Sequence, residues 1–352
     1  MIRFGILGCG RIAKRHADLL GTGQIAGAKL AAVCDIDPAR ADAFATRHGV
    51  RGHVRLDDLL ADPQVDVVSV LTPSGLHADH AIAVARSGRH VVVEKPMALT
   101  LSDADRMIEA ADAAGVRLFV VKQNRFNVPV VKAREALDAG RLGQLVLGTV
   151  RVRWCRDQAY YDHDAWRGTY ALDGGVIANQ ASHHVDMLGW FMGPATSVYA
   201  RGSRALVRIE AEDTAVATVR FASGALGVIE ATGATRPRDL EGSLSVLGSQ
   251  GSIEISGFAV NQMRHWEFSQ PQADDVQVRE RFSVNPPNVY GFGHQAYYQH
   301  VVDCLAGGRA ALVDGVEGRR SLELIVALYE SMACGGEVEF PVRVRHSRLG
   351  VR

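Results

Sequence analysis

The sequence predicts an α/β protein in two parts: a doubly wound parallel sheet, followed by an α+β domain with a large, open, mainly antiparallel sheet. Two observations support this prediction. Up to about residue 122, short β-branched runs alternate with longer amphipathic stretches, which is typical of a parallel sheet covered by helices on both faces. From residue 123 onward, apolar and polar residues alternate between Gly and Ser turns, which indicates antiparallel strands with one solvated or partner-covered face. We therefore expect domains at 1–122 and 123–352.

The expected parallel strands are apolar runs, and the stretches between them are the expected helices. One such stretch, SDADRMIEAADAAG at 102–115, opens with Ser-x-x-Asp and ends on a glycine, which are the start and stop signals of a helix. The strand runs are IRFGIL (2–7), LAAVCD (30–35), VDVVSVL (65–71), HVVVEKP (90–96) and RLFVVKQ (117–123).

The second part contains longer alternating segments, which predict the antiparallel sheet. They are followed by two expected helices and a short closing strand. The alternating segments are LVLGTVRVRWCRD (145–157), TAVATVRFASGALGVIEATG (214–233) and GSLSVLGSQGSIEISG (242–257); the helices are GHQAYYQHVVDCLAG (293–307) and VEGRRSLELIVALYESMACG (316–335), and the strand is EVEFPVRV (337–344).

Composition excludes several classes of protein. The chain carries 39 basic and 39 acidic residues, so neither nucleic acid nor an anionic membrane is expected as a partner. The five cysteines are far apart and odd in number, so neither a disulfide framework nor a thiolate metal cluster is expected. No apolar run approaches the roughly 20 residues of a membrane span, and the start does not read as a secretory signal. We expect a cytoplasmic protein. The cysteines are Cys9, Cys34, Cys155, Cys304 and Cys334.

A glycine motif directly after the first expected strand predicts a dinucleotide site. Gly8, Gly10 and Ala13 form GxGxxA: the first glycine allows a tight turn, the second lets a pyrophosphate approach the backbone, and the small third residue lets helix and strand pack closely. The backbone at Arg11 and Ile12 opens the helix, whose free N–H groups would face the phosphates. The motif therefore predicts a Rossmann-type nucleotide site.

The acidic residue after the second strand indicates which dinucleotide binds. Asp35 follows the glycine motif at roughly the spacing of the fingerprint, about 20 residues. A carboxylate there accepts hydrogen bonds from the ribose hydroxyls and repels a 2′-phosphate, so we expect NAD rather than NADP. Arg40, in the first turn of the next helix, is expected to be a solvated surface charge.

Polar residues at the ends of later strands are candidates for catalysis and binding, because ligands bind at the carboxyl ends of parallel strands. Lys95 in Glu94-Lys95-Pro96 reads either as a proton shuttle with a lowered pKa or as a surface lysine paired with Glu94. In TPSGLH (72–77), Thr72, Ser74 and His77 read either as cofactor contacts or as loop and capping residues.

The segment IANQASHHVDM (177–187) holds the remaining candidates. Read as a helix, it puts Asn179, His183 and Asp186 at i, i+4 and i+7 on one face and points His184 elsewhere. Any chemistry then belongs to His183 and its two neighbours on that face. A metal site would need ligands from elsewhere, and the sequence has neither HExxH nor a Cys/His cluster, so we expect no metal.

Together the glycine motif, Glu94-Lys95-Pro96 and GGVIANQASHHVDML (174–188) resemble the Gfo/Idh/MocA family of NAD(P)-dependent sugar and inositol dehydrogenases, over essentially the whole chain. The resemblance implies a Rossmann domain followed by a substrate and subunit-contact domain. It implies that Lys95 and His183 are catalytic. Asn179 stands where the commonest family pattern has aspartate, and an amide cannot act as a base. Asp186 then either orients His183 or packs structurally.

The resemblance also implies which residues bind the ligands. Cofactor contacts are implied for Thr72, Ser74 and His77, and for Trp166 and Arg167 in AWRG. The complete set expected at the cofactor is Gly8, Gly10, Arg11, Ile12, Asp35, Thr72, Ser74, His77, Glu94, Lys95, Gln123, Trp166 and Arg167, and the set expected at the substrate is Lys95, Asn124, Arg156, Tyr160, Asn179, His183, Arg236 and Arg238.

Three segments are similar to the WlbA/WbpB-like subgroup: VVKQNRFNVPVVKAREALDAGRLGQL, RVRWCRDQAYYDHDAWRGTYALDGG and the Asn179 variant of the histidine motif. That subgroup oxidises the 3′-hydroxyl of UDP-N-acetylglucosaminuronic acid for bacterial O-antigen synthesis, with 2-oxoglutarate reoxidising the bound NADH. A nucleotide sugar is thus the expected substrate, 2-oxoglutarate a possible partner, and a homodimer or homotetramer the expected assembly. The alternatives are another sugar or inositol dehydrogenase, and a non-catalytic NAD sensor, which would have no reason to keep both Lys95 and His183.

Overall fold

The computed structural model describes residues 1–284 and 291–351 and divides them into two compact units. The first unit comprises Met1–Val121 and His294–Arg320, and the second comprises Lys122–Gly293 and Ser321–Arg352. Because the segment His294–Arg320 packs with the first unit, neither unit is one continuous stretch of the chain.

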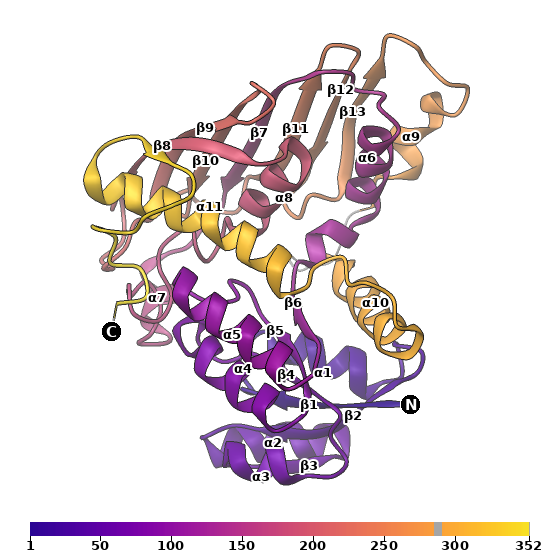
Figure 1. The fold of residues 1–352 in the computed structure, drawn as a ribbon, viewed down its shortest axis with the longest axis vertical. Helices are drawn as coiled ribbons and strands as arrows, with labels where there is room; N and C mark the ends of the chain where they lie inside the picture. Colours follow the sequence, from indigo (N-terminus) through magenta and orange to yellow (C-terminus); the bar gives the residue numbers. More distant parts are fainter. Residues whose placement is uncertain (285–290, 352) are drawn as a thin grey trace. The chain divides into compact units, whose positions relative to one another are not determined.

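The first unit is built on a parallel sheet of six strands in the order β3-β2-β1-β4-β5-β6, as the strand runs predict. The order reverses between β1 and β4, and such a reversal opens the crevice where dinucleotides bind. Figure 1 shows α4 and α5 side by side along this sheet. The strands are β1 (Ile2–Leu7), β2 (Ala28–Cys34), β3 (Arg51–His53), β4 (Val67–Val70), β5 (His90–Val93) and β6 (Leu118–Val120).

The helices of this unit bury small apolar side chains against the sheet. Ala13, Ala17 and Leu19 of α1 are fully buried, so the helix lies close to the strands. The helix expected at 102–115 begins earlier, at Leu101, because the Thr100 hydroxyl rather than Ser102 caps it, accepting from the Asp103 N–H at 3.1 Å. The helices are α1 (Ala13–Gly21), α2 (Pro38–His48), α3 (Leu56–Ala61), α4 (His77–Arg86), α5 (Leu101–Ala113) and α10 (Gly293–Gly307), with a 3₁₀ turn η1 (Ser74–Leu76).

The second unit carries a sheet of eight strands in the order β13-β12-β11-β7-β10-β9-β8-β14. Neighbouring strands are antiparallel except β10 and β7, which are parallel. The fold class expected from the sequence is thereby confirmed. The strands are β7 (Leu145–Arg153), β8 (Ala195–Ser203), β9 (Thr214–Phe221), β10 (Leu226–Thr232), β11 (Glu241–Gly248), β12 (Gly251–Ser256), β13 (Gln262–Phe268) and β14 (Val338–Glu339).

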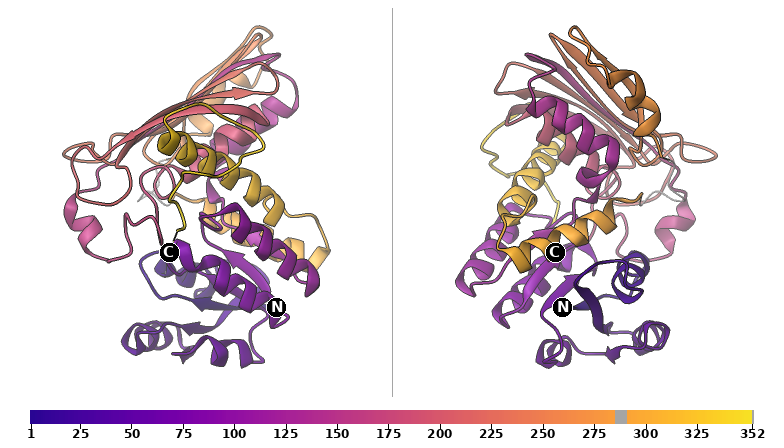
Figure 2. Two further views of the ribbon diagram at one scale, coloured as in Figure 1. Left: turned by 60° about the vertical axis from the view of Figure 1, so that its left-hand side comes forward. Right: turned by 90° about the vertical axis from the view of Figure 1, so that its right-hand side faces the viewer.

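Helices cover one face of this sheet, as Figures 1 and 2 show for α8 and α11. The Ser331 hydroxyl of α11 accepts from the N–H of Ala200 in β8. The strand expected at 337–344 is shorter than predicted, since Pro341 has no N–H to extend a ladder beyond Glu339. The helices are η2 (Gln123–Phe126), α6 (Val128–Asp138), α7 (Gln158–Asp162), α8 (Ser182–Met192), α9 (Asp275–Arg281) and α11 (Gly315–Cys334).

Candidate active site

The glycine loop between β1 and α1 fits a pyrophosphate. Gly8 has φ +96°, and a Cβ added there would lie 2.9 Å from the Leu71 carbonyl oxygen, so only glycine suits this turn. A Cβ at Gly10 would meet nothing within 4 Å, so its backbone is open to a ligand. Arg11 is exposed and Ile12 half-buried at the start of α1. The loop thus has room for the phosphates that the motif predicts, and the phosphate site stays a prediction.

Asp35 is fixed against this loop directly after β2. Its Oδ2 accepts from the backbone N–H of Cys9 at 2.7 Å, and its Oδ1 accepts from that of Asp37 at 2.9 Å. An ionised carboxylate is only an acceptor and has about four lone-pair positions, so capacity remains for ribose hydroxyls. The Arg40 guanidinium pairs with Asp37 at 3.3 Å and is more than half exposed, in agreement with the expected surface charge.

The loop after β4 is fastened by His77. Its Nδ1 lies 2.8 Å from the Pro96 carbonyl oxygen and its Nε2 lies 2.8 Å from that of Thr72. Both ring nitrogens of this buried side chain thus face main-chain oxygens, and burial lowers its pKa. The imidazole therefore joins two turns, and the cofactor contact implied for His77 stays a prediction. Thr72 bonds through Oγ1 to His80 at 2.9 Å, and Ser74 is buried in η1.

Glu94-Lys95-Pro96 follows the end of β5. The Glu94 carboxylate is buried, and its Oε2 accepts from the backbone N–H of Lys95 at 2.9 Å. Burial opposes ionisation of this carboxyl, but the hydrogen bond from His16 and the nearby ring of His294 outweigh burial and hold its pKa well below the usual value. An inward-facing Glu94 does not match the surface Lys–Glu pair that was one interpretation of the sequence.

Potential metal ligands cluster around Glu94 rather than at the histidine motif (177–187). Among the residues that the structure describes, His16, Glu94 and His294 form a buried group whose ligand atoms lie within 4.8 Å of one another. The His16 Nε2 is 3.1 Å from the Glu94 Oε1, a hydrogen-bond distance. The geometry is that of a buried polar network.

The second unit holds the histidine motif, where one expectation is wrong. Helix α8 begins at Ser182, so Asn179 lies in the preceding turn and does not share a helical face with His183. There the Asn179 N–H donates to the Gly175 carbonyl oxygen, and its side-chain amide donates to Asp173. Asn179 is thus held by a buried carboxylate that the sequence analysis did not single out.

His183 lies in the first turn of α8 and is 7 % exposed. The Gln123 amide nitrogen lies 2.9 Å from its Nε2. If the amide donates, the ring proton of neutral His183 is on Nδ1. Gln123 and Asn124 are both buried in η2. Gln123 was expected to contact the cofactor and His183 the substrate, and their side chains are in direct contact.

Asp186 forms a buried ion pair. Of its two expected roles, orienting His183 or packing structurally, this contact favours the structural one. Its oxygens accept from Nε and Nη2 of Arg125 at 2.8 and 2.7 Å, and the Lys122 Nζ lies at 3.8 Å. Burial alone would raise its pKa, but Arg125 and Lys122 hold it below the usual value. His184 is fully buried against Trp154, and burial lowers its pKa to about 3.

The expected cationic residues form two groups in this unit. Arg167 stacks over Trp166 and Tyr160 and donates to the Tyr160 hydroxyl at 2.8 Å. In the other group, Arg236 donates to the Arg156 carbonyl oxygen at 3.1 Å, Arg156 pairs with Asp239 at 3.0 Å, and Arg236 and Arg238 are exposed.

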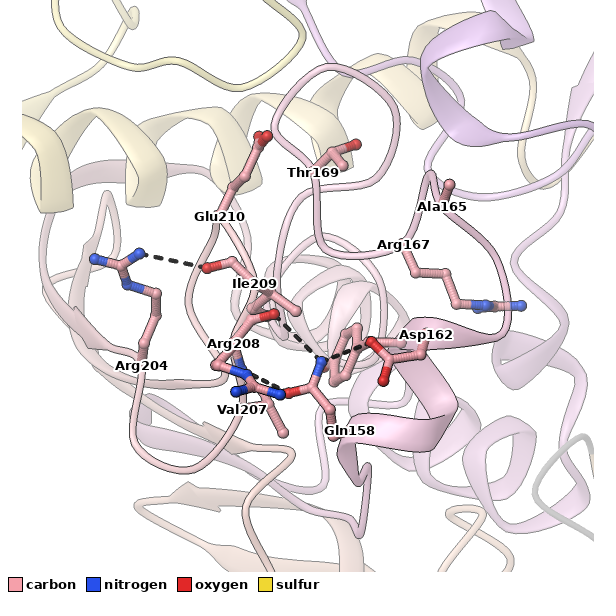
Figure 3. A pocket seen from close by; sticks show the side chains of 11 residues that line it. Gln158, Asp162, Ala165, Arg167, Thr169, Arg204, Val207, Arg208, Ile209 and Glu210 are labelled. Carbon is pink, nitrogen blue, oxygen red and sulfur yellow. Dashed lines mark hydrogen bonds between the residues drawn. The ribbon is translucent and has the colours of Figure 1, made fainter.

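Arg167 also lines a pocket of about 750 Å³. Figure 3 shows Gln158 between two elements of its wall: the side-chain nitrogen donates to Asp162, and the side-chain oxygen accepts from the backbone N–H of Arg208. Arg204 lies on the side of the view opposite Arg167, and its guanidinium donates to the Ile209 carbonyl oxygen. The wall residues are Gln158, Tyr161, Asp162, Ala165, Arg167, Thr169, Arg204, Val207, Arg208, Ile209 and Glu210.

Two sets of buried polar residues were missed by sequence reasoning. His16 in GRIAKRH lies one turn after Ala13 on the buried face of α1, which is a signal that could have been used. Asp173 and Glu212 lie in loops, where no periodicity marks a buried residue. Burial raises the pKa of Glu212 to about 7.

The parallel sheet, the glycine loop and Asp35 are those of an NAD-binding domain of the Rossmann type, carried by one of two compact units. The chain matches the family described as oxidoreductase, NAD-binding Rossmann fold, over residues 2–122, and its C-terminal alpha/beta domain over residues 134–340. It belongs to this Gfo/Idh/MocA oxidoreductase family, which confirms the predicted family and the NAD cofactor. Among the described residues, no helix is both long and apolar enough to cross a bilayer.

Relatives in this family act on sugars and inositols. The crystal structure of the WlbA dehydrogenase from Bordetella pertussis in complex with NADH and UDP-GlcNAcA is 44 % identical, with a TM-score of 0.90, over 97 % of this chain and 98 % of that one. The WlbA dehydrogenase from Chromobacterium violaceum, with the same ligands, is 44 % identical over 97 % and 96 % of the two chains, also with a TM-score of 0.90. Myo-inositol 2-dehydrogenase of Thermotoga maritima is 34 % identical over 72 % of this chain and 74 % of its own length.

Proposed function

We propose that this enzyme oxidises the 3′-hydroxyl of UDP-N-acetyl-D-glucosaminuronic acid to the 3-keto sugar with NAD, within bacterial O-antigen and lipopolysaccharide sugar synthesis in the cytoplasm. The observation that carries this proposal is the 44 % identity, over 97 % of the chain, to two dehydrogenases whose structures hold NADH and UDP-GlcNAcA. The inositol dehydrogenase of Thermotoga maritima is less similar and is matched over less of the chain.

In the proposed mechanism, NAD would be held by the glycine loop and Asp35 and would supply the hydride acceptor for C3′. His183 takes the hydroxyl proton, and Lys95 donates a hydrogen bond to the oxygen as it becomes a carbonyl. We expect the sugar hydroxyl to take over the position at the His183 Nε2 that the Gln123 amide holds here. The same Gln123 contact orients the imidazole before substrate arrives. Asn179 contributes no base, because it is an amide that donates to Asp173.

The substrate carries a diphosphate and a carboxylate, so its site needs several cations. We propose that Arg156, Arg236 and Arg238 supply them. The first two lie next to each other, and Asp239 is the carboxylate that pairs with Arg156. A guanidinium has five N–H donors, so these arginines keep capacity for phosphate oxygens beyond their present contacts. Tyr160 lies within cation–π distance of Arg156 and offers a ring face for the base or sugar.

A substrate screen under single-turnover conditions tests this proposal. Equal amounts of enzyme and NAD are mixed with UDP-N-acetylglucosaminuronate, free sugars or inositols, and NADH absorbance is followed. We expect a burst with the nucleotide sugar that is at least about tenfold faster than with the others, because a site built for charged groups loses binding when they are missing. A faster burst with an inositol would make the second candidate, an inositol dehydrogenase, correct. No burst with any substrate would favour the NAD sensor.

We also propose that 2-oxoglutarate reoxidises NADH in place, so that the cofactor stays bound through turnover. The absorption spectrum of material released from the purified protein tests this. Co-purified NADH that disappears when 2-oxoglutarate is added before denaturation would support it. NADH that persists after the addition would contradict it.

The open face of the eight-stranded sheet supports a homodimer or homotetramer. Outward-facing side chains of β9 and β10 include Val216 at 53 % exposure and Leu226 at 50 %, next to the ion pair of Arg153 with Glu230. Large exposed apolar patches mark interaction sites. Light scattering at micromolar concentration tests this proposal, and a monomer peak would contradict it.

A further inference from the structure

We propose that a buried chain of hydrogen bonds, made by Ser69, Tyr298, His16 and Glu94, positions Lys95 for its reaction. This inference rests on the proposed catalytic role of Lys95. It assigns a function to α10, which comes from the last fifth of the sequence and packs with the first unit.

The chain of contacts is continuous. The Ser69 Oγ lies 2.9 Å from the Tyr298 hydroxyl, which lies 2.6 Å from the His16 Nδ1. The His16 Nε2 lies 3.1 Å from the Glu94 Oε1, and the Glu94 Oε2 accepts from the Lys95 backbone N–H at 2.9 Å. The network therefore ends on the main chain of the residue whose side chain is proposed to act.

The charge of the last member fixes the direction of the hydrogen bond next to it. The pKa of Glu94 is held low, so its ionised carboxylate can only accept. The His16 Nε2 therefore donates to Glu94. The links from His16 to Tyr298 and from Tyr298 to Ser69 are made by groups that can donate or accept. Each member thus has a hydrogen-bond partner on the path to Glu94.

The burial of the polar side chains in this network supports a role in positioning Lys95. His16, Ser69 and Tyr298 are fully buried and Glu94 is 6 % exposed. Apolar side chains could fill this core without the cost of desolvating a carboxylate. A satisfied polar network instead fixes a unique geometry. It also joins α1, which directly follows the glycine loop, to the lysine turn, so the cofactor loop and Lys95 share one support.

The His294 ring adds a fifth side chain to this network of Ser69, Tyr298, His16 and Glu94. Its Nε2 lies 3.9 Å from the Glu94 Oε1, and its ring packs edge-on against His16 at 5.2 Å. His294 and Tyr298 are four residues apart on α10, so they share one face of that helix. One helix thus contacts both Glu94 and the histidine that binds Glu94.

Tyr298→Phe is the most selective test, because it removes one hydroxyl and leaves the ring packed edge-on against Phe4 at 5.5 Å. The control is Tyr297→Phe, which removes a hydroxyl from a neighbouring buried tyrosine of the same helix. On the best substrate of the screen, we expect Tyr298→Phe to lower kcat about tenfold, because loss of orientation reduces rate rather than binding. The KM and the NADH dissociation constant should stay within about threefold, and Tyr297→Phe should retain the wild-type kcat.

A double variant separates positioning from general damage. If Tyr298 acts through Lys95, Tyr298→Phe should lower kcat about tenfold in the wild type and leave the already low kcat of Lys95→Ala unchanged. An equal tenfold loss in both backgrounds, or a wild-type kcat in Tyr298→Phe, would overturn the inference. Stoichiometric zinc in the purified protein that His294→Ala loses would also overturn it, since the cluster would then be a metal site. Full activity of Lys95→Ala would instead refute the proposed role of Lys95.

Discussion

Replacement of Glu212 by Gln should change how the stability of the protein depends on pH. Glu212 is buried, and its Oε1 accepts from the Ile177 N–H at 3.0 Å and the Tyr329 hydroxyl at 2.8 Å. Burial raises its pKa to about 7, although these contacts oppose the rise, and Asp173 adds to it. A glutamine keeps an oxygen for both donors and resembles the protonated acid in shape and charge.

The sign of the effect follows from the raised pKa. The folded state binds the Glu212 proton more tightly than the unfolded state, whose carboxyl has the usual pKa near 4.5. This stability is fully present below about pH 4.5 and is lost as pH rises to about 7. The pKa difference corresponds to roughly 3 kcal/mol in total, of which about 2 to 3 kcal/mol falls between pH 5 and 8. The glutamine variant has no such loss.

The assay is urea unfolding of both proteins at pH 5 and pH 8. We expect the difference in free energy of unfolding, Glu212→Gln minus wild type, to be about 2 to 3 kcal/mol larger at pH 8 than at pH 5, so that the variant is relatively more stable at pH 8. Glu230→Gln is a control with no pH dependence in this range, because Arg153 holds the pKa of Glu230 below its usual value of 4.5. Glu230 therefore contributes stability that is lost only below about pH 4.5, so the loss in the Gln variant should be nearly equal at pH 5 and pH 8. An equal difference between Glu212→Gln and the wild type at both pH values would refute the reasoning.

Three further predictions concern the site. Lys95→Ala and His183→Ala should each lower kcat at least about 10²-fold; steady-state kinetics measures this, and full activity of either variant would remove its role. Asp35→Ser should raise kcat/KM with NADP relative to NAD, because the carboxylate that repels a 2′-phosphate is gone; an unchanged ratio in cofactor kinetics would contradict this. Asp186→Asn should lower the free energy of unfolding by about 3 kcal/mol, because it leaves the buried charge of Arg125 uncompensated; a urea midpoint like that of the wild type would contradict it.

The parts of the fold that depend on local pattern could be predicted from the sequence. The strand runs and the glycine turn at Gly8 agree with the structure, because side-chain periodicity and backbone sterics act over short distances. The antiparallel sheet expected from residue 123 starts only at Leu145, because η2 and α6 come first. The packing of His294–Arg320 with the first unit could not be predicted. It depends on contacts between segments far apart in the chain, such as His16 with Tyr298.

The error at Asn179 has the same origin. Asn179 was placed on a helical face with His183, but the helix begins only at Ser182. The position where the helix starts depends on turns in which the Gly175 and Val176 carbonyl oxygens accept backbone hydrogen bonds, and side-chain periodicity does not reveal such turns. His77 has the residue type of a cofactor ligand, but whether its nitrogens are available depends on where the Pro96 carbonyl lies. Residue type predicted possible chemistry, and tertiary contacts decided which atoms remain for it.

The most direct measurement is the single-turnover rate of NADH formation in Lys95→Ala, in His183→Ala and in the variant carrying both changes. If a lysine and a histidine serve one hydroxyl together, the doubly changed enzyme should be little slower than the slower single variant, since residues that act as a unit are not additive. Rate losses that multiply across the two positions would show that they act independently and would contradict the proposed chemistry.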